Sequence, residues 1–402
     1  MTAFAYSAIN AQGLALKGEL HALDAEAATQ LLHARGLLPQ SLSEVETSAS
    51  GAGTVFKKVK PKSLQIFSRQ FATLVEAGVN IVSALLILEE QTDDQVLAVV
   101  IAEVRAEVEA GRILSKAFAR HPRVFNRLYC SMIEAGEASG TLDRVLDRAA
   151  VQIEKETQLK RRVKGALVYP IVVLSFATLV LVGMLLFIVP VFVNIFKQLN
   201  GNLPTITSYV LGASNLLRHH WYVILPLLAL AAFGLIRAKR TERGRRVWDH
   251  MKLRMPMRIG DVVLKVTMAR FSRTLASLVA AGVDIVKALE ITAAAAGNRV
   301  VEDAVITVRH RVREGAPIAQ PLIENPVFPP MVGQMIKIGE ETGELEKMLG
   351  KIADFYEDEV DTAVGSLTAI IEPVLMIGVG VMVGVIVISM YLPMFRMLQL
   401  VQ

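Results

Sequence analysis

"MIEAGEASGTLDRVL" occupies residues 132–146, and "MIKIGEETGELEKML" occupies residues 335–349. Seven of the fifteen positions are identical at a constant offset of 203. A second pair, "FSRQFATLVEAGVNIVSAL" at 67–85 and "FSRTLASLVAAGVDIVKAL" at 271–289, agrees at 13 of 19 positions. Such a repeat indicates that the chain contains one structural unit twice.

Apolar residues recur at helical spacing after the glycine that closes each segment. The first stripe follows Gly140 and comprises Leu142, Val145, Leu146, Ala149, Ala150 and Ile153; the second follows Gly343 and comprises Leu345, Met348, Leu349, Ile352, Ala353 and Tyr356. One apolar stripe is typical of a helix that packs on a bundle. We therefore expect a mainly α-helical fold in which residues 63–166 and 237–369 each form a cytoplasmic bundle of about six helices.

The composition indicates a membrane protein. The chain is 53% hydrophobic, which is more than a soluble protein of ordinary composition carries. A transmembrane helix needs about 20 apolar residues, and three stretches are candidates: 167–196, the shorter 219–236, and 370–395. The first and third each end one repeat unit, so the second is predicted to be the return helix. A buried core helix is the alternative for each stretch, above all for the short second one.

Lysine and arginine predict the direction of these spans. They gather before the first span and after the second, whereas residues 197–218 carry only Lys197 and Arg218. Because basic flanks stay in the cytoplasm, we expect an external loop at 197–218, a short external tail at 396–402, a cytoplasmic N-terminus and a periplasmic C-terminus. We interpret the basic flanks as topology signals, with contact to anionic lipid as an addition, and do not expect direct binding of nucleic acid.

A small α/β module is expected at residues 1–46. "FAYSAI" and "LALKGEL" alternate as strands do, residues 24–35 have a helical pattern, and "SLSEV" is a candidate third strand. The start of the chain lacks the basic and apolar regions of a secretory signal. Residues 47–62, with "TSASGAGT", have the composition of a flexible linker.

The sequence carries no pattern for catalysis. It lacks the glycine-rich loop followed by Lys-Ser/Thr, the His-Glu-x-x-His pair, zinc spacings of Cys and His, and the Gly-x-Ser-x-Gly elbow. We therefore expect no enzyme activity, no catalytic residue and no cofactor. Acidic clusters near both repeats leave a divalent cation as a minor alternative to a solvated or docking face. The lone Cys130 is interpreted as a small buried hydrophobe.

Two groups of residues are candidates for contacts. The recurring residues of the repeat are candidates for docking a partner: Gly136, Glu137, Gly140, Gly339, Glu340 and Gly343. For the two glutamates, capping of a neighbouring helix or a salt bridge to it is an equally weighted alternative. Four residues of the third span are candidates for packing inside the membrane: Glu372, Pro373, Gly380 and Gly384. The glycine pair has the small-xxx-small spacing that lets helices approach.

These segments, together with "ALVYP", "FPPMVGQMIKIGEETGELEKML" and "EPVLM", resemble the inner-membrane platform proteins of type II secretion systems and type IV pili. The likeness covers nearly the whole chain. The N-terminal module is similar to the secretion branch, while "FYEDEVDTAVGSLTAIIEP" and "MYLPMF" are more similar to the pilus branch, so both stay open.

The resemblance implies a non-enzymatic platform in the inner membrane. It would couple a hexameric cytoplasmic assembly ATPase to insertion or extraction of pilin or pseudopilin subunits. Other implied partners are further inner-membrane assembly proteins and additional copies of the chain. An oligomeric transporter or channel is the alternative, and a scaffold unrelated to pili is a third. Against a transporter, the spans lack charged residues that would line a path.

Overall fold

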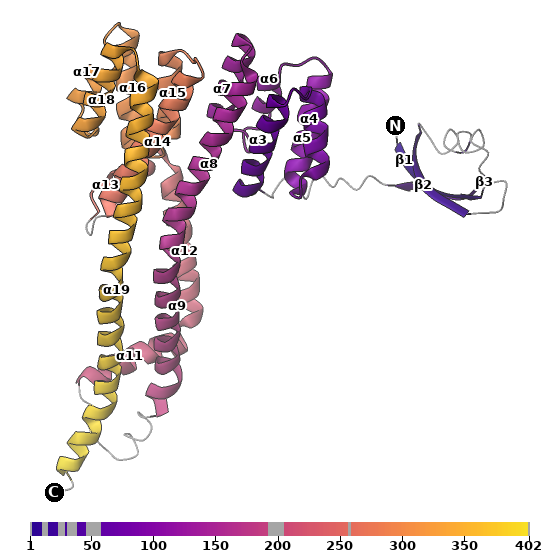
Figure 1. Cartoon of the computed structure of the whole chain (residues 1–402). Helices are drawn as coiled ribbons and strands as arrows, with labels where there is room; N and C mark the ends of the chain where they lie inside the picture. Colours follow the sequence, from indigo (N-terminus) through magenta and orange to yellow (C-terminus); the bar gives the residue numbers. More distant parts are fainter. Residues whose placement is uncertain are drawn as a thin grey trace.

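The computed structural model describes the backbone of residues 2–9, 15–22, 29, 38–45, 58–191, 205–255 and 259–400. Two helical heads lie at one end of a long bundle of apolar helices, and the C-terminus lies at the other end (Figure 1). The fold is mainly α-helical, as the sequence predicts.

The N-terminal module contains a three-stranded antiparallel sheet in the order β2-β1-β3. Its strands are β1 Thr2–Ile9, β2 Ala15–Ala22 and β3 Leu38–Val45. All three predicted strands are confirmed. The predicted helix at 24–35 and most of the linker at 47–62 lie outside the described residues.

The first head is a bundle of six helices. They are α3 Pro61–Glu76, α4 Ile81–Gln91, α5 Gln95–Glu109, α6 Leu114–Ala119, α7 Arg127–Ser139 and α8 Leu142–Ala166. Asn80, Asp94 and Asn126 cap the starts of α4, α5 and α7 through side-chain oxygens, which satisfies backbone N–H groups that a helix start leaves free. The predicted stripe on α8 is the buried one, since Val145, Leu146, Ala149 and Ala150 are all at most 2% exposed.

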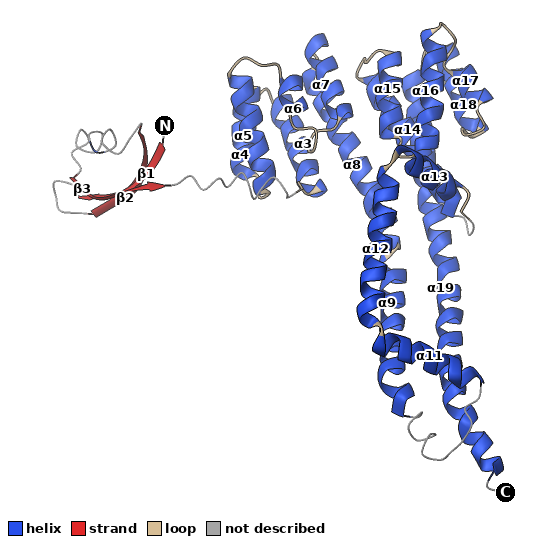
Figure 2. Cartoon of the chain, turned by 180° about the vertical axis from the view of Figure 1, so that it is seen from behind, coloured by secondary structure: helices blue, strands red, loops and turns tan. Residues whose placement is uncertain are grey.

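The second head repeats this plan. Its helices are α14 Ile259–Ala280, α15 Ile285–Ala295, α16 Arg299–Arg313, α17 Ala319–Glu324, α18 Pro330–Thr342 and the first part of α19, which spans Leu345–Leu400. Figure 2 shows the two bundles side by side from behind. Their buried apolar residues form one continuous cluster, so the heads share a core.

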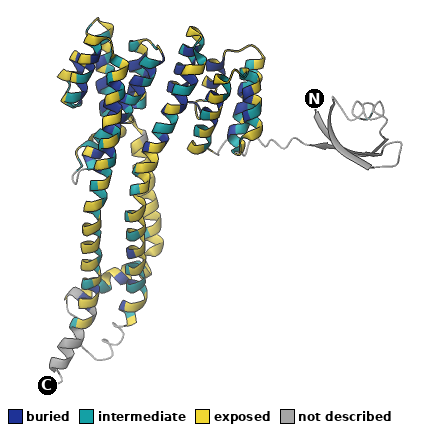
Figure 3. Ribbon diagram, in the orientation of Figure 1, coloured by how far each residue is buried: buried dark blue, intermediate teal, exposed yellow. Residues whose placement is uncertain are grey.

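Three helices have the length and composition to cross a membrane. One path runs through α8, α9 Val168–Gly183 and the π-helical turn η1 Met184–Ile188; the others are α12 Trp221–Arg240 and α19. Their apolar side chains are exposed in the isolated chain, in contrast with the buried cores of the heads (Figure 3). Exposed apolar side chains along a whole helix suit a lipid environment.

The third span does not begin as a separate helix at residue 370. Instead, α19 runs unbroken from the head through Pro373. A proline inside a helix costs about 3 kcal/mol, but an end within the bilayer would leave several backbone groups without partners. Continuing the helix is therefore the less costly solution.

The segment between the first two spans is helical where the structure describes it, in place of the loop expected at 197–218. It contains α11 Thr205–His219, which lies across α9 and α19 at their far end (Figure 1). The hydroxyl of Thr207 donates to the carbonyl of Ser389 at 2.7 Å, and that of Ser214 donates to the carbonyl of Leu185 in η1 at 2.5 Å. The expected tail at 396–402 is likewise helical as far as Leu400.

A further helix, α13 Glu242–Leu253, follows α12 at the level where the heads meet the spans (Figure 1). The buried Asp249 ties it to the second head, because its carboxylate accepts the backbone N–H of Arg299 at 3.0 Å. This contact places α13 against the start of α16.

Candidate functional site: the two heads and the cleft between them

Glu137 holds together two helices of the first head. Its side chain reaches from α7 to the start of α6, where Oε1 accepts the N–H of Leu114 at 2.6 Å and Oε2 accepts the N–H of Ser115 at 3.2 Å. α6 has only six residues and no cap of its own. A carboxylate at a helix start satisfies free N–H groups and complements the helix dipole.

Glu340 makes the same contact in the second head. Its two oxygens accept the N–H groups of Ile318 at 2.8 Å and Ala319 at 3.1 Å, at the start of α17. The capping interpretation of both glutamates is therefore confirmed. Their docking role stays a prediction. The glutamates would contribute to it by holding the short helices that form the surrounding surface.

The glycines of the segment also have structural reasons. A Cβ on Gly136 would lie 2.9 Å from Cβ of Val145, and one on Gly339 would lie 3.0 Å from Cα of Leu345. Both residues thus allow close approach of the following long helix. Gly140 and Gly343 end α7 and α18 with φ of 69° and 73°, a left-handed conformation that glycine adopts without strain.

A groove lies beside Glu340 on the second head. It has a volume of about 490 Å³ and lies between α17 and α18, with Pro317, Ile323, Lys337 and Glu341 among its lining. Ile323 is 50% exposed, and Ile338, on α18 but not in the lining of the groove, is also 50% exposed. Two large apolar side chains among charges on the tip of a head indicate a candidate partner surface.

The first head lacks this apolar character at the matching positions. By the repeat, Ala119 corresponds to Ile323, and Ala135 corresponds to Ile338. The two heads therefore share the capping glutamate but differ in the apolar character of their exposed surface beside it. We call the groove lined by Ile323 and its neighbours on α17 and α18 the tip groove.

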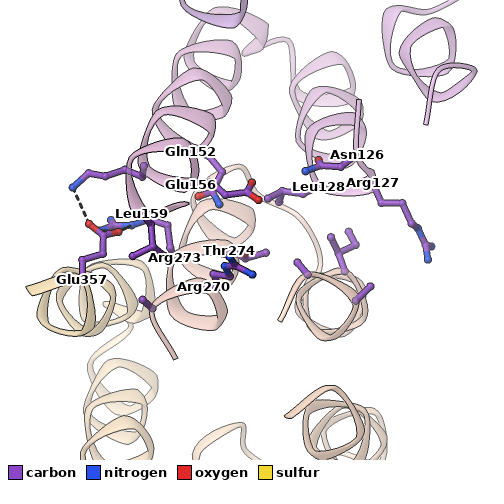
Figure 4. Close-up of a pocket in the computed structure, with 15 residues that line it drawn as sticks. Asn126, Arg127, Leu128, Gln152, Glu156, Leu159, Arg270, Arg273, Thr274 and Glu357 are labelled. Carbon is purple, nitrogen blue, oxygen red and sulfur yellow. Dashed lines mark hydrogen bonds and ion pairs between the residues drawn. The ribbon is translucent and has the colours of Figure 1, made fainter. Parts of the chain in front are cut away.

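A second hollow lies between the two heads (Figure 4). It has a volume of about 330 Å³ and is lined by α7 and α8 of the first head and by α14, α15 and α19 of the second. Arg273 and Glu357 lie on one wall and Gln152 on another. The Nε atom of Arg270 is buried there without a hydrogen-bond partner among the described residues.

Ion pairs fix one head against the other. Lys155 of α8 contacts Glu357 of α19 at 3.0 Å, and Glu134 contacts Lys287 at 2.8 Å. The hydrogen bond from Lys287 lowers the pKa of Glu134 from its ordinary value. Two further pairs, Arg148–Glu346 at 3.0 Å and Arg162–Asp361, also join α8 to α19. Equivalent helices of the repeat have thus acquired opposite charges where they meet.

Acidic residues of the clusters noted in the sequence also form ion pairs within a single head. Glu156 contacts Lys160, Glu344 contacts Lys347, and Glu359 contacts Lys265. Among the residues that the structure describes, no group of three or more His, Cys, Asp or Glu side chains is arranged to hold a metal ion. Glu156, Glu344 and Glu359 thus make electrostatic contacts within the fold.

Comparison with known proteins shows which family has this duplicated architecture. Residues 67–190 and 271–393 both match the family described as type II secretion system (T2SS), protein F, and residues 1–43 match its N-terminal domain. The matched segments together cover more than half of the chain. The chain belongs to the type II secretion system protein F family.

Relatives of this protein F family chain include pilus and secretion proteins. It is 43% identical to the type IV pilus assembly protein PilC of Thermus thermophilus, over 99% of this chain and 98% of that protein. It is 41% identical to PilC of Myxococcus xanthus, over 99% and 96%. With the type II secretion system protein F of Pseudomonas aeruginosa the identity is 34%, over the full length of both. These relatives and the three apolar helices identify an inner-membrane protein.

Each protein F segment corresponds to a head and its outgoing span, so the family domain is the repeated unit. An ion pair that recurs in both copies of this unit is missing from the candidate residues predicted from the sequence. Arg69 contacts Glu154 at 2.7 Å, and Arg273 contacts Glu357 at 2.8 Å, each joining the first and last helices of a head. Both members recur at the repeat offset, in the "FSR" triplets and in the long helices, and this recurrence is the signal that could have found them.

Among the residues that the structure describes, no contact explains the four candidate residues of the third span. Glu372 and Pro373 are exposed, and a Cβ on Gly380 or Gly384 would meet no atom within 4 Å. The contact between α9 and α19 instead uses neighbours such as Val379 and Ile386. Intramembrane packing through these four residues therefore stays a prediction, and it would involve contacts with other molecules in the membrane.

Proposed function

We propose that the protein is a non-enzymatic, multi-pass platform of a type IV pilus assembly machine. Its heads face the cytoplasm and contact a hexameric assembly ATPase, and its spans guide pilin subunits into or out of the membrane. The identity of 43% to a pilus assembly protein, against 34% to a secretion protein F, supports the pilus branch. The basic residues beside the heads support their cytoplasmic side, with a cytoplasmic N-terminus and a periplasmic C-terminus.

One observation carries the proposal: helices run without a chain break from the heads into the spans. The path from Leu142 to Val191 has 50 residues, and α19 has 56. At 1.5 Å per residue these paths are roughly 75 and 84 Å long, well over twice the ~30 Å hydrocarbon core. A displacement of the heads would therefore reach the spans through rigid elements.

The cytoplasmic contact is proposed at the tip groove and the adjoining surface of α18. Helices α17 and α18, which carry the exposed Ile323 and Ile338, lie at the end of the second head away from the spans (Figure 1), where a large soluble motor has access. Apolar residues ringed by charge are the usual centre of a protein interface.

Co-purification tests this contact. The detergent-solubilised protein should retain the assembly ATPase, and the double variant Ile323→Ser with Ile338→Ser should lose most of it. The matched control is Leu86→Ser with Val99→Ser, two exposed apolar residues of the first head. Undiminished ATPase recovery by the tip-groove variant, with the protein folded, would contradict this assignment.

A further inference from the structure

Helix α13 has two chemically different faces. Its inner face is anchored on the second head, where Asp249 has 5% of its side chain exposed and contacts Lys252 at 2.8 Å as well as the N–H of Arg299. Its outer face exposes Val247 at 68% and Met251 at 44%. These two residues are one helical turn apart, so they form an apolar stripe.

Basic residues follow the same spacing beside this stripe. Arg246, His250 and Arg254 line an open groove of about 650 Å³ together with Val247, Met251, Val300 and Asp303. Asp303 is already compensated, because it contacts both Arg246 and Arg299 at 3.2 Å. Arg254 is exposed and has no ion-pair partner among the described residues. The groove therefore presents net positive charge over an apolar floor.

The position of this groove indicates which class of ligand it binds. α12 ends at Arg240 and α13 begins at Glu242, so the helix that carries the groove starts within one turn of a candidate membrane span. Lys239 lies 3.7 Å from the centre of the Trp248 ring, and tryptophan favours the membrane interface. A soluble anion would leave Val247 and Met251 in water, whereas a lipid covers both parts.

We propose that this groove binds an anionic phospholipid, with its headgroup at Arg246 and Arg254 and its acyl chains along Val247 and Met251. Helix α13 then lies in the bilayer interface as an amphipathic helix with basic and apolar residues on its outer face. It lies between the two protein F segments, outside both. The assignment is independent of the pilus proposal, since it concerns only the bilayer.

The two tryptophans of the chain allow a direct test. In the full-length Trp221→Phe variant, Trp248 is the only tryptophan, and brominated acyl chains quench its fluorescence on contact. The variant is reconstituted as single copies in phosphatidylcholine nanodiscs that contain either brominated phosphatidylglycerol or brominated phosphatidylcholine at equal low fractions. We expect preferential quenching by the brominated phosphatidylglycerol.

Removing the positive charges at the proposed headgroup site should remove this preference. Arg246→Gln with Arg254→Gln in the same background should lower the relative affinity for phosphatidylglycerol by about fivefold or more, since each basic residue near the surface contributes about 1 kcal/mol, or roughly fivefold. The matched control is Arg112→Gln with Arg313→Gln, which removes the same charge from exposed sites in the heads. The control should keep the preference.

Several results would overturn the proposal. Equal quenching by both brominated lipids would exclude anionic selectivity, and no quenching would remove α13 from the bilayer. Quenching that disappears when each nanodisc holds two copies would show that a second copy covers the groove instead. The first measurement needs no charge variant, so it decides the matter even if the double variant fails to fold.

Discussion

At the scale of single residues, Glu137 and Glu340 direct both carboxylate oxygens to backbone N–H groups of a neighbouring short helix. The repeated segment therefore joins three helices. In the first head, Glu137 on α7 caps α6, Gly136 lets α8 approach α7 closely, and Gly140 ends α7 in a left-handed conformation. Any docking by these residues depends on this scaffold, which places the tip groove beside Glu340.

Substitutions can separate capping from docking. Because hydrogen bonds to charged groups contribute about 1.5–3 kcal/mol and helix caps about 0.5–2 kcal/mol, Glu137→Ala with Glu340→Ala should lower the thermal midpoint of the heads by several degrees and reduce pilus output. The Gln variants retain one acceptor and should be intermediate. Normal thermal unfolding with lost ATPase recovery would instead show that the glutamates bind the partner directly.

Cys130 offers a clean probe of the first head. Burial raises the pKa of its thiol to about 11 from an ordinary value of 9.0, so its thiolate fraction at neutral pH is about 100-fold lower than that of a free thiol. Maleimide labelling of the native protein should be slower by about this factor than labelling in denaturant, and should still accelerate above pH 10. Rapid native labelling at neutral pH would show that the helix α7 is not packed as described.

At the scale of elements, the sequence predicts helices better than it predicts what lies between them. The stripe after Gly140 is buried as expected because spacing along one helix determines which face is apolar. The Glu137 cap joins residues 23 positions apart through chain folding that no local pattern encodes. The scarcity of basic residues at 197–218 predicts only that this segment faces outward, and it carries no signal for α11, whose Thr207 and Ser214 donate to carbonyls of the spans.

The contact between α8 and α19 is also long-range, and charge reversal tests it. Arg148→Glu with Arg162→Glu would place acids against Glu346 and Asp361. Exposed pairs contribute about 0.2–1 kcal/mol each, so the two reversals should loosen the heads by roughly 1–2 kcal/mol and increase cleavage in limited proteolysis. Reversing Glu346 and Asp361 to arginine as well should restore resistance, and failure to restore it would place these helices apart.

At the scale of the whole molecule, the repeat, the return helix α12 and the shared core place both heads at one end of the spans. Under the proposed function, this arrangement would give a soluble motor one combined surface to act on. A reporter fused at residue 201, between the first two spans, should therefore be active only outside the cytoplasm. Activity inside the cytoplasm would reverse the direction of the whole platform.

The central claim is that heads and spans move together through continuous helices, and the most direct measurement is pilus output after those helices are interrupted. Four glycines inserted after Ala166 and again after Gly365 would break both paths, while the same insertion after Gly111, at the turn before α6 with φ of 87°, serves as the control. We expect the doubly interrupted protein to enter the membrane and retain the ATPase but to assemble no surface pili. Pilus assembly at the control's level would contradict it.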